Sequence, residues 1–443
     1  MTFAELNLSN QLLNALTDLG FTTPTTIQAK AFSPIMSGKD VLGIAQTGTG
    51  KTIAFLLPCL RQWKFSKEKF PQIVVLVPTR ELVVQVVEVV RQLTRYMNVE
   101  VGGVYGGANI NTQALMVQNG LDVLVGTPGR LLDLILNGAL RTRNVKRLVI
   151  DEVDEMLDLG FRHQLTSIFD LMPAKRQNLL FSATLRDEVT ELIDTFFNHP
   201  VRIEAAPAGT PLANIGQRAY RIPNFHTKIN LLELLLKTHP DMSKVLVFVG
   251  TRQLADDLYD EMGKRFPGQI GVIHSRKLQN FRFRAVEQYQ KGEIRVLIAT
   301  DLIARGIDIL DVTHVVNFDT PDDAESYIHR IGRTGRADRK GVALSFFTEL
   351  DADKVAAIEE LMGMQVPMVE LPDALIVSDR FLPIDMPKVD MKNQLVKTPS
   401  LKEGSGAFHE RAEHNKKVNQ KITRAEAMMK KYGKPQTRGQ KRK

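Results

Sequence analysis

Short runs of consecutive apolar residues recur along most of the chain, separated by longer stretches in which apolar residues stand three or four positions apart. A short continuous apolar run is typical of a strand buried on both faces, and the wider spacing is typical of an amphipathic helix. The alternation therefore predicts an α/β fold with a doubly wound parallel sheet. In the first half of the chain, strands are predicted over residues 41–44, 73–77, 122–125, 147–150 and 178–181. Helices are predicted over residues 53–60, ending near Pro58, over 80–96, and in the segment that ends at Asn137.

A second alternation of the same kind fills the next part of the chain. Its strands are predicted over residues 245–249, 271–274, 294–299, 313–318 and 342–347, and its helices over 253–265 and 280–290. Between the two alternations, residues 205–217 contain two prolines and no periodicity, which predicts a linker. We therefore expect a first domain over residues 1–204, a linker over 205–217, a second domain over 218–365 and a C-terminal extension over 366–443.

The two ends of the chain differ in their patterns. Near the N-terminus, the leucines between positions 6 and 19 predict a short amphipathic helix that is capped by Gly20. Beyond about residue 365 no strand is predicted, and residues 380–407 contain several prolines. In the tail, helical spacing recurs among lysines at Val418, Ile422, Ala425, Met429 and Tyr432. This spacing suits either a basic helix that orders on a partner or a solvated tail, and we expect disorder in the unbound chain.

Composition limits the classes of protein to which the chain can belong. No apolar run approaches the ~20 residues that a membrane-spanning helix needs, and no secretory signal is visible at the start. Cys59 is the single cysteine, so no disulfide can form within the chain, and a reducing cytoplasmic compartment is expected. The formal net charge of the chain is +8. Residues 401–443 alone carry +9, from thirteen Lys or Arg and four Glu, so the rest of the chain is close to neutral. This predicts a nucleic-acid-binding extension on a nearly neutral body.

A glycine loop stands between the first predicted strand and its helix, with the sequence Ala45-Gln46-Thr47-Gly48-Thr49-Gly50-Lys51-Thr52. Glycines at such a position let the backbone turn tightly and point N–H groups at phosphate oxygens, and the following helix N-terminus adds partial positive charge. Lys51 would reach the β- and γ-phosphates, and the Thr52 hydroxyl would ligate Mg²⁺. The strict phosphate-loop pattern has Gly where this chain has Ala45, and a glycine-rich turn that binds nothing is the alternative.

Two further clusters carry polar groups suited to phosphate chemistry. Asp151 and Glu152 end a predicted strand whose neighbour is expected to carry the glycine loop. One carboxylate there could hold Mg²⁺ and the other could orient and deprotonate water, although a lone Asp-Glu pair is usually an exposed turn. In the second alternation, Arg333 and Arg336 stand three apart and could stabilise transferring phosphate charge, or could grip nucleic-acid phosphates.

Gln28 is a candidate for nucleotide recognition upstream of the loop. It follows the turn Gly20-Phe21-Thr22-Thr23-Pro24, and its amide can offer one acceptor and one donor to the N6/N7 edge of adenine. The alternative is a surface glutamine that follows a turn, and its position alone favours that alternative.

Taken together, these segments resemble the motifs of the DEAD-box RNA helicase family over roughly residues 3–360. The stretch from Gly20 to Gln28 resembles the adenine-reading Q motif, with Phe3 as its upstream aromatic residue, and the glycine loop resembles motif I, in which Ala at the first position is usual. Each further motif is a weak match by itself, and the order and spacing make the set specific. The further motifs are Pro78-Thr79-Arg80-Glu81-Leu82, Gly106-Gly107, Thr127-Pro128-Gly129-Arg130, Asp151-Glu152-Val153-Asp154, Ser182-Ala183-Thr184, Val247-Phe248, Gln279-Asn280-Phe281-Arg282, the segment from Thr300 to Asp308, and the segment from His329 to Arg336.

The resemblance implies two RecA-like domains that close over ATP and single-stranded RNA. It implies that Gln28 reads adenine, that Lys51, Thr52 and Asp151 hold ATP–Mg²⁺, partly through water, and that Glu152 activates the attacking water. The nucleotide site would also include Phe3, Phe21, Ala45, Gln46, Thr47, Gly48, Thr49, Gly50 and Asp308, with Arg333 and Arg336 as arginine fingers. The RNA side would include Thr79, Arg80, Gly106, Gly107, Thr127, Arg130, Thr300 and Arg305. Coupling between the domains would involve Asp154, Ser182, Thr184 and His329.

The chain departs from the family pattern at two positions, because Val83 and Val153 stand where Ala is usual. A β-branched residue can fit a strand end, so activity is expected to survive at Val153. The expected function is an ATP-dependent RNA helicase that unwinds short duplexes and remodels RNA–protein complexes, with little sequence preference. An ATP-gated RNA clamp with little net unwinding needs the same motifs and remains an alternative. The Q motif and Ser182-Ala183-Thr184 disfavour a third possibility, a related DNA helicase.

Overall fold

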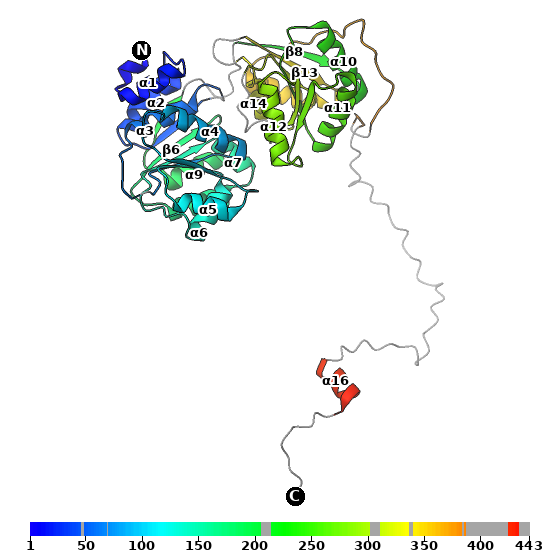
Figure 1. Ribbon diagram of the computed structural model, residues 1–443. Coiled ribbons are helices and arrows are strands. Elements are labelled where there is room, and N and C mark those ends of the chain that lie inside the picture. The colour runs from blue at the N-terminus through cyan, green and yellow to red at the C-terminus, as the bar shows by residue number, and fades with distance from the viewer. Residues whose placement is uncertain are drawn as a thin grey trace. The chain divides into compact units, whose positions relative to one another are not determined.

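The computed structural model describes residues 1–45, 48–68, 70–204, 214–301, 311–335, 340–382, 385–386 and 424–433. The chain forms two compact units, Met1–Pro387 and Lys388–Lys443. The first unit contains two parallel sheets, each with helices packed on both faces (Figure 1). We call residues 1–204 the first lobe and residues 214–386 the second lobe. The predicted fold class, two doubly wound α/β domains in tandem, is confirmed.

All strands of the first sheet run parallel, in the order β3-β4-β2-β5-β6-β1-β7. The strands are β1 (Val41–Ile44), β2 (Ile73–Leu76), β3 (Val101–Val104), β4 (Val123–Gly126), β5 (Arg147–Asp151), β6 (Gln177–Ser182) and β7 (Val201–Glu204). The five predicted strands of this half are present. The strands β3 and β7 were not predicted, because glycines interrupt the apolar run of β3 and polar residues alternate along β7.

The prediction that the strand ending at Asp151 lies beside the strand of the glycine loop is wrong. Strand β5 pairs with β2 and β6, and β6 lies between β5 and β1. A fully apolar strand looks the same whichever neighbours it has, so the local sequence does not contain the strand order. The consequence is that the end of β6, at Ser182, stands between the acidic strand end and the loop.

The helices of the first lobe cover its sheet in two layers. Alternate residues of β2 point to opposite faces, so that Ile73 and Val75 join one core cluster and Val74 and Leu76 join the other. The first cluster is covered by α1 (Asn10–Asp18), α2 (Thr26–Met36), α3 (Lys51–Arg61) and α4 (Arg80–Leu93). The second is covered by α5 (Ile110–Gln118), α6 (Pro128–Leu136), α7 (Val153–Asp158), α8 (Arg162–Leu171) and α9 (Asp187–Phe196).

Two helix predictions in the first lobe differ from the structure. The leucine-rich N-terminal segment forms a 3-10 turn, η1 (Phe3–Leu6), and then α1, because Asn7 adopts a left-handed conformation that separates them. Helix α3 continues through Pro58 to Arg61 instead of ending near the proline. Proline removes one helical hydrogen bond, and the burial of the surrounding residues from Ala54 to Leu60 outweighs that loss.

The second sheet has six parallel strands in the order β10-β11-β9-β12-β13-β8. They are β8 (Ile215–Arg221), β9 (Val245–Val249), β10 (Ile270–Ile273), β11 (Val296–Thr300), β12 (His314–Asn317) and β13 (Gly341–Phe347). Strand β8 begins inside the segment predicted as a linker, where Ile215 pairs with Gly341 of β13. The remainder of that predicted linker, residues 205–213, lies outside the described residues.

The helices of the second lobe pack on both faces of its sheet. Those in the described ranges are α10 (Phe225–Thr238), α11 (Arg252–Arg265), α12 (Gln279–Gln290), α14 (Ala324–Ile331) and α15 (Ala352–Met362), with the 3-10 turn η2 (Glu349–Asp351) before α15. After α15 the chain crosses back over this lobe, with Met368 bridged to Ala219 and the Asn224 side chain bonded to the Ser378 carbonyl. Leu371, Leu375 and Leu382 pack on the core of the lobe. The described part of the crossing therefore belongs to the second lobe by its contacts.

The second compact unit contains α16 (Arg424–Tyr432), which lies on the tail segment of helical spacing. In the described ranges of the chain, no helix is long and apolar enough to cross a membrane.

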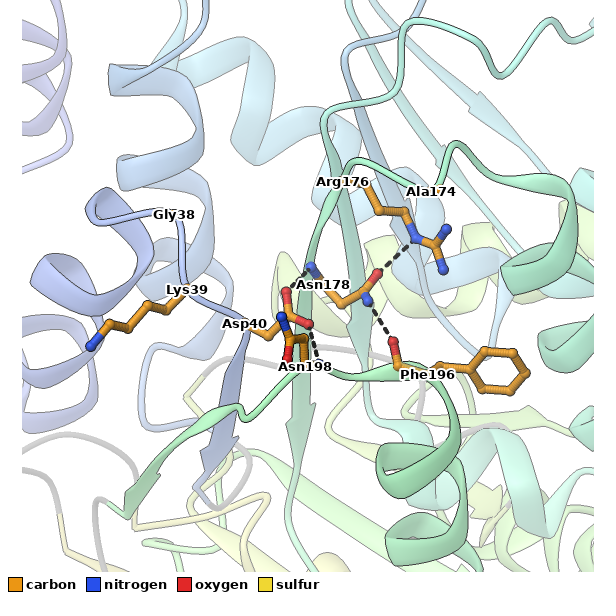
Figure 2. A pocket seen from close by; sticks show the side chains of 8 residues that line it. All are labelled: Gly38, Lys39, Asp40, Ala174, Arg176, Asn178, Phe196 and Asn198. Carbon is orange, nitrogen blue, oxygen red and sulfur yellow. Dashed lines mark hydrogen bonds between the residues drawn. The ribbon is translucent and has the colours of Figure 1, made fainter.

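A pocket of about 370 Å³ lies at the amino ends of β1 and β6 (Figure 2). Its polar side chains bond to the protein itself. The Asp40 carboxylate accepts the backbone N–H groups of Asn178 at 2.8 Å and Asn198 at 2.9 Å, and the Asn178 side chain accepts Arg176 Nε at 2.8 Å. Ligands of doubly wound sheets bind at the opposite edge, at the carboxyl ends of the strands. We therefore interpret these bonds as an anchor for the strand ends and expect the active site at the other edge.

Candidate active site

The glycine loop follows β1 and leads directly into α3. Gly48 and Gly50 have φ angles of 81° and 88°, which place both in the left-handed region that favours glycine. A Cβ at Gly50 would also collide with the side-chain amide of Gln28. Ala45 precedes the turn and donates its N–H to the Ser182 carbonyl at 3.0 Å, so the start of the loop is held beside the end of β6. Gln46 and Thr47 lie outside the described residues.

Gln28 is buried and clasps the glycine loop from α2. Its Nε2 donates to the Gly50 carbonyl at 3.2 Å, and its Oε1 accepts the Thr25 N–H at 2.9 Å. The Thr25 hydroxyl donates to the Thr49 carbonyl at 2.8 Å. With 5% of its surface exposed, Gln28 is not the surface residue of the alternative interpretation. Its amide keeps one further N–H and one further acceptor direction for a ligand.

Lys51 is the first residue of α3, and its side chain is buried within the loop. Its Nζ has no hydrogen-bond partner among the described residues. The carboxylates of Asp151, Glu152 and Asp154 lie near enough to feel its charge, and its three N–H donors are left for a further anion such as a phosphate. The half-buried Thr52 follows at the helix N-terminus. The donor set therefore fits a bound polyphosphate.

The acidic pair ends β5 in an unusual backbone conformation. Glu152 has φ 55° and ψ 49°, a left-handed conformation that is strained for a residue with a side chain, and its N–H donates to Asp151 Oδ1 at 3.0 Å. Both residues are buried, and Glu152 Oε2 has no hydrogen-bond partner within the described part of the chain. Backbone strain of this kind is concentrated at functional sites, which marks Glu152 as a candidate functional residue.

Burial shifts the acid–base behaviour of this pair. Burial, together with the charge of Asp151, raises the pKa of Glu152 from 4.5 to about 7, while the charges of Lys51 and Arg333 oppose the rise. Burial also raises the pKa of Asp151, and the charge of Lys51 opposes it. A carboxylate with a pKa near neutrality can accept a proton from water in the physiological pH range, as a general base must.

Asp154 connects the acidic strand end to the end of β6. Its Oδ2 accepts the N–H groups of Ala183 and Thr184 and the Thr184 hydroxyl, each at 3.1 Å. Burial alone would raise the pKa of Asp154, but the charges of His329 and Lys51 lower it overall. Asp154 is therefore an anion held by donors, and Ser182, at the end of β6, is fully buried beside it.

Two side chains of the second lobe act on the carboxylates of the first. Arg333, which is 3% exposed and donates Nε to the His329 carbonyl at 3.3 Å, lowers the pKa of Glu152 through its charge. His329, near the end of α14, does the same to Asp154. The predicted finger Arg333 is thus close enough to Glu152 to act on it. Arg336 and Asp308 lie outside the described residues.

On the predicted RNA side, Arg80 and Gly107 are packed together. Thr79 caps α4 by accepting the Leu82 N–H at 3.3 Å, and Arg80 follows as the first helical residue. Gly107 has φ 80°, and a Cβ there would collide with the Arg80 guanidinium. The half-buried Gly106 precedes it. These residues form a backbone surface beside a cation, which suits a phosphate chain.

Arg130 is more buried than a residue that only grips RNA. Its Nη1 donates to Gln113 Oε1 at 2.8 Å and its Nη2 to the Ala108 carbonyl at 3.0 Å, so it shapes the loop that contains Gly107. Thr127 and Thr300 are both 7% exposed, at the start of α6 and the end of β11. Arg305 lies outside the described residues.

The two aromatic residues assigned to the nucleotide site lie in different surroundings. Phe3 is buried in the core of the first lobe, whereas 44% of the Phe21 side chain is exposed.

The sequence-based reasoning missed an ion pair that joins the lobes. Glu81, 4% exposed in its side chain, pairs with Arg282 Nη2 at 2.5 Å and accepts Gln279 Nε2 at 2.7 Å. Gln279 in turn accepts Arg282 Nη1 at 3.1 Å. All three residues lie in segments that were recognised as motifs, but nothing in the local sequence indicates that a carboxylate in one lobe pairs with an arginine about 200 positions away.

Arg330 is a second residue that was not singled out. It is fully buried, with two nitrogens on the Asp301 carboxylate, at 2.5 and 2.6 Å, and Nη1 on the Asp319 carbonyl at 2.6 Å. Its guanidinium carbon lies 5.3 Å from the centre of the Phe248 ring. Arg330 therefore fixes α14 to the end of β11, where Thr300 and Asp301 stand.

Comparison with known proteins gives independent information on the same segments. The model of the DEAD/DEAH box helicase family matches residues 25–192, and the model of the helicase conserved C-terminal domain matches residues 227–338. The chain is 39% identical over 372 residues to the DEAD-box ATP-dependent RNA helicase CshA of Bacillus cereus, covering 84% of this chain and 70% of CshA. It is 37% identical over 384 residues to the ATP-dependent RNA helicase RhlB of Shewanella amazonensis, covering 84% and 87%.

Solved structures give the same result. Dbp5 of S. cerevisiae, bound to RNA and ADP BeF3, is 31% identical, with a TM-score of 0.76 over 84% of this chain and 95% of Dbp5. A truncated Mss116p bound to single-stranded RNA and AMP-PNP is 27% identical, with a TM-score of 0.76 over 84% of this chain and 78% of that one.

Proposed function

The chain belongs to the DEAD-box family of ATP-dependent RNA helicases, and we propose that Lys51, Glu152 and Arg333 perform the ATP hydrolysis that drives its action on RNA. It is an RNA-stimulated ATPase of that family. One observation carries the assignment of residues: Arg333 of the second lobe and Glu152 of the first are both buried, and near enough for the arginine charge to oppose the rise in the pKa of Glu152. A catalytic site that needs both lobes couples hydrolysis to whatever closes the lobes.

In this proposal ATP binds along the glycine loop. Lys51 Nζ, buried and without a hydrogen-bond partner among the described residues, receives the β- and γ-phosphates. The free N–H and acceptor of the Gln28 amide face the adenine edge, while its other two bonds keep the loop in place. Base recognition and loop geometry are thereby linked through one side chain, so ATP is preferred to other nucleotides.

Thr52 and Asp151 are the residues that would hold Mg²⁺, which when bound neutralises charge on the β- and γ-phosphates. The raised pKa of Asp151 fits this role, because a buried carboxylate gains most from a neighbouring cation. In the described ranges no group of three or more His, Cys, Asp or Glu side chains is arranged to hold a metal. Few protein ligands are expected for Mg²⁺, since substrate phosphates and waters supply the others.

Glu152 then acts as the general base of the hydrolysis. Its free Oε2 and its pKa of about 7 allow it to orient a water molecule and take its proton. Arg333 would stabilise the negative charge that develops on the transferred phosphoryl group, together with Arg336. Asp308 would contact the ribose and the γ-phosphate.

RNA binds along Thr79, Arg80, Gly106, Gly107, Thr127 and Arg130 of the first lobe and Thr300 and Arg305 of the second. The structures of Dbp5 and Mss116p with RNA support this proposal by likeness of fold. Phosphate contacts position a strand without reading its sequence, so sequence preference should be slight. A strand bent by closure no longer fits a duplex, which separates a few base pairs, and hydrolysis resets the enzyme through Asp154, Thr184, Ser182 and His329.

We further propose that residues 401–443 tether RNA near the two lobes. Their net charge of +9 is spread over lysines and arginines with Phe408 and Tyr432 as the aromatic residues, which suits phosphate contact more than base stacking. The alternative is that the tail binds a protein of an RNA–protein complex. We also propose that the enzyme acts in the cytoplasm.

The ATPase rate with RNA, with DNA and with neither tests this function. We expect RNA to stimulate turnover strongly and DNA to stimulate it little. Full turnover without nucleic acid would contradict the coupling of the lobes. Strand displacement of a short duplex distinguishes the unwinding enzyme from the ATP-gated clamp, which would hold RNA in ATP without releasing a strand.

A further inference from the structure

Arg186 connects the two lobes outside the family motifs. It lies two residues after Thr184, at the N-cap of α9. Its Nε donates to Glu325 Oε2 at 2.6 Å, its Nη2 contacts the same oxygen, and its Nη1 donates to Asp158 Oδ1 at 2.6 Å. The Asp323 carboxylate is 3.9 Å from Nη2. All three guanidinium nitrogens are therefore used, on acidic groups of both lobes.

The partners of Arg186 stand on or beside the two helices that adjoin the catalytic groups. Asp158 is the last residue of α7, the helix that begins directly after Glu152. Asp323 caps α14 by accepting the N–H groups of Glu325 and Ser326, and Glu325 lies in the first turn of that helix. Helix α14 ends at Ile331, so the same rigid element continues toward Arg333.

The surroundings favour the charged and bonded state of Arg186. Burial opposes its charge, but the hydrogen bonds and charge of Glu325, followed by the charges of Asp158 and Asp323, raise the pKa of Arg186 above its ordinary value. Its side chain is 32% exposed and that of Glu325 is 25% exposed, so water screens this pair only in part. By contrast, the ion pair of Arg162 with Glu191 lies within the first lobe, with side chains 53% and 62% exposed.

We propose that Arg186 is a positioning residue that latches α14 to the first lobe and so sets how often the lobes are closed before catalysis. The proposal rests on the proposed function, because closure matters only if Arg333 must reach Glu152. The hydrogen bonds and ion pairs of Arg186 are made with Glu325, Asp158 and Asp323, so it would act through α14. Its removal should lower the closed fraction without altering the chemistry of the closed state.

This role predicts that losing Arg186 weakens the apparent binding of RNA and ATP but leaves turnover at saturation nearly unchanged. When only a fraction of molecules is competent, the apparent affinity falls by that fraction, while saturating ligand still drives the population to the closed state. Arg186→Gln should therefore raise the RNA concentration for half-maximal ATPase and the KM for ATP by about fivefold or more, in the usual range of coupling between sites. Turnover at saturating RNA and ATP should stay within about twofold of the wild type.

A double-mutant cycle with Glu325→Gln tests whether the effect passes through the pair. We expect the double variant to be no weaker than the stronger single variant, because either change breaks the same contact. Arg186→Lys should have a smaller effect on the half-saturating RNA and ATP concentrations than Arg186→Gln, since lysine keeps the charge but lacks the planar set of nitrogens that arginine offers. Arg162→Gln and Glu191→Gln form the matched control, and they should leave both concentrations unchanged.

Closure can also be measured directly by energy transfer between dyes attached to two introduced cysteines. The native Cys59 does not interfere, because it is buried and burial raises the pKa of its thiol to about 12. Dyes attached through Leu136→Cys and Leu350→Cys, at exposed positions of the two lobes, would report closure by energy transfer without labelling Cys59. We expect Arg186→Gln to need more RNA and ATP analogue to reach the closed signal. An unchanged closure curve, additive single effects, or a fall in saturated turnover with unchanged half-saturation would overturn the proposal. Arg333→Ala separates the two hypotheses, since full RNA-stimulated turnover in that variant contradicts the proposed function itself.

Discussion

Asp154 and Thr184 are joined by two hydrogen bonds of 3.1 Å, from the backbone N–H and from the hydroxyl of Thr184 to the same oxygen, Oδ2 of Asp154. Asp154 follows Asp151 by three residues and Glu152 by two, and Thr184 precedes Arg186 by two residues. If ATP binding moves the acidic strand end, these bonds would pass the movement to the end of β6, and from there toward the second lobe. This short path supports coupling between the nucleotide and RNA sites.

The first prediction concerns this pair. Asp154→Asn keeps the size of the side chain, but places an NH₂ group against backbone N–H donors in either orientation of the amide. Buried donors left without an acceptor cost about 1–3 kcal/mol, so the geometry of the strand ends should change. We expect ATP binding to be retained and RNA-stimulated turnover and strand displacement to fall at least tenfold, measured with a fluorescent ATP analogue and a short duplex. Thr184→Val, which removes one of the three donors, should have a smaller effect. Normal displacement by Asp154→Asn would disprove the coupling role.

The second prediction concerns pH and the stability of the nucleotide-free protein. Because the pKa of Glu152 rises from 4.5 in the unfolded chain to about 7 in the folded one, the folded state holds more protons between these values. The free energy of unfolding contributed by this group is therefore present below pH 4.5 and is lost as pH rises to 7. Glu152→Gln cannot ionise and escapes that loss, so it should be more stable than the wild type by on the order of 3 kcal/mol at pH 8 and by little at pH 5. Denaturant unfolding at the two pH values measures it, and a stability difference that does not grow with pH would show that Glu152 is not buried as described.

The third prediction concerns the choice of nucleotide. If the free donor and acceptor of Gln28 face adenine, guanine presents an acceptor where adenine presents a donor, and the site leaves polar groups unpaired. The kcat/KM for GTP should be at least tenfold below that for ATP in the presence of RNA. Gln28→Ala should reduce this preference and also raise the KM for ATP, because the bond to the Gly50 carbonyl is lost as well. Equal kcat/KM values for ATP and GTP in the wild type would contradict adenine recognition by Gln28 and leave it only the role of holding the glycine loop.

The fourth prediction concerns the basic tail. Deleting residues 401–443 should weaken RNA binding and raise the RNA concentration for half-maximal ATPase, with turnover at saturating RNA nearly unchanged. Each lost phosphate contact should flatten the salt dependence of RNA affinity by about 0.7 in log–log slope for a single strand. A salt series on the full-length and truncated proteins measures this. Identical affinities and slopes would rule out the tether and leave solubility or a protein partner as the role of the tail.

The sequence predicted the fold well where burial is complete. Strands such as Ile73–Leu76 and Val245–Val249 are apolar at every position, and this pattern is hard to mistake when glycine, proline and amphipathic helices stand between the strands. The edge strands β7 and β8 were missed because they alternate polar and apolar residues, and β8 lies beside a proline-containing segment. Strand order was not predictable, because it depends on pairings that each strand could satisfy equally well with other neighbours.

The candidate site could be predicted as far as its chemistry is local. Lys51, Asp151 and Glu152 stand in short segments whose residue types indicate phosphate and water chemistry directly. The pairs that join distant parts, Glu81 with Arg282 and Arg330 with Asp301, have no local signal, because charged residues at such positions are usually solvated. Likewise the internal role of Arg130 follows from its burial, which its position in a short turn-and-helix segment does not reveal.

The steady-state ATPase rate of Glu152→Gln at saturating RNA tests the central claim most directly. The substitution keeps the shape of the side chain and removes only the base, so ATP and RNA should bind as in the wild type while turnover falls by about 10²–10⁴-fold. Binding of a labelled RNA in the presence of ATP, measured on the same preparation, serves as the control that the site is intact. Near-normal turnover by this variant would contradict the assignment of Glu152 as the base and, with it, the catalytic site described for this helicase.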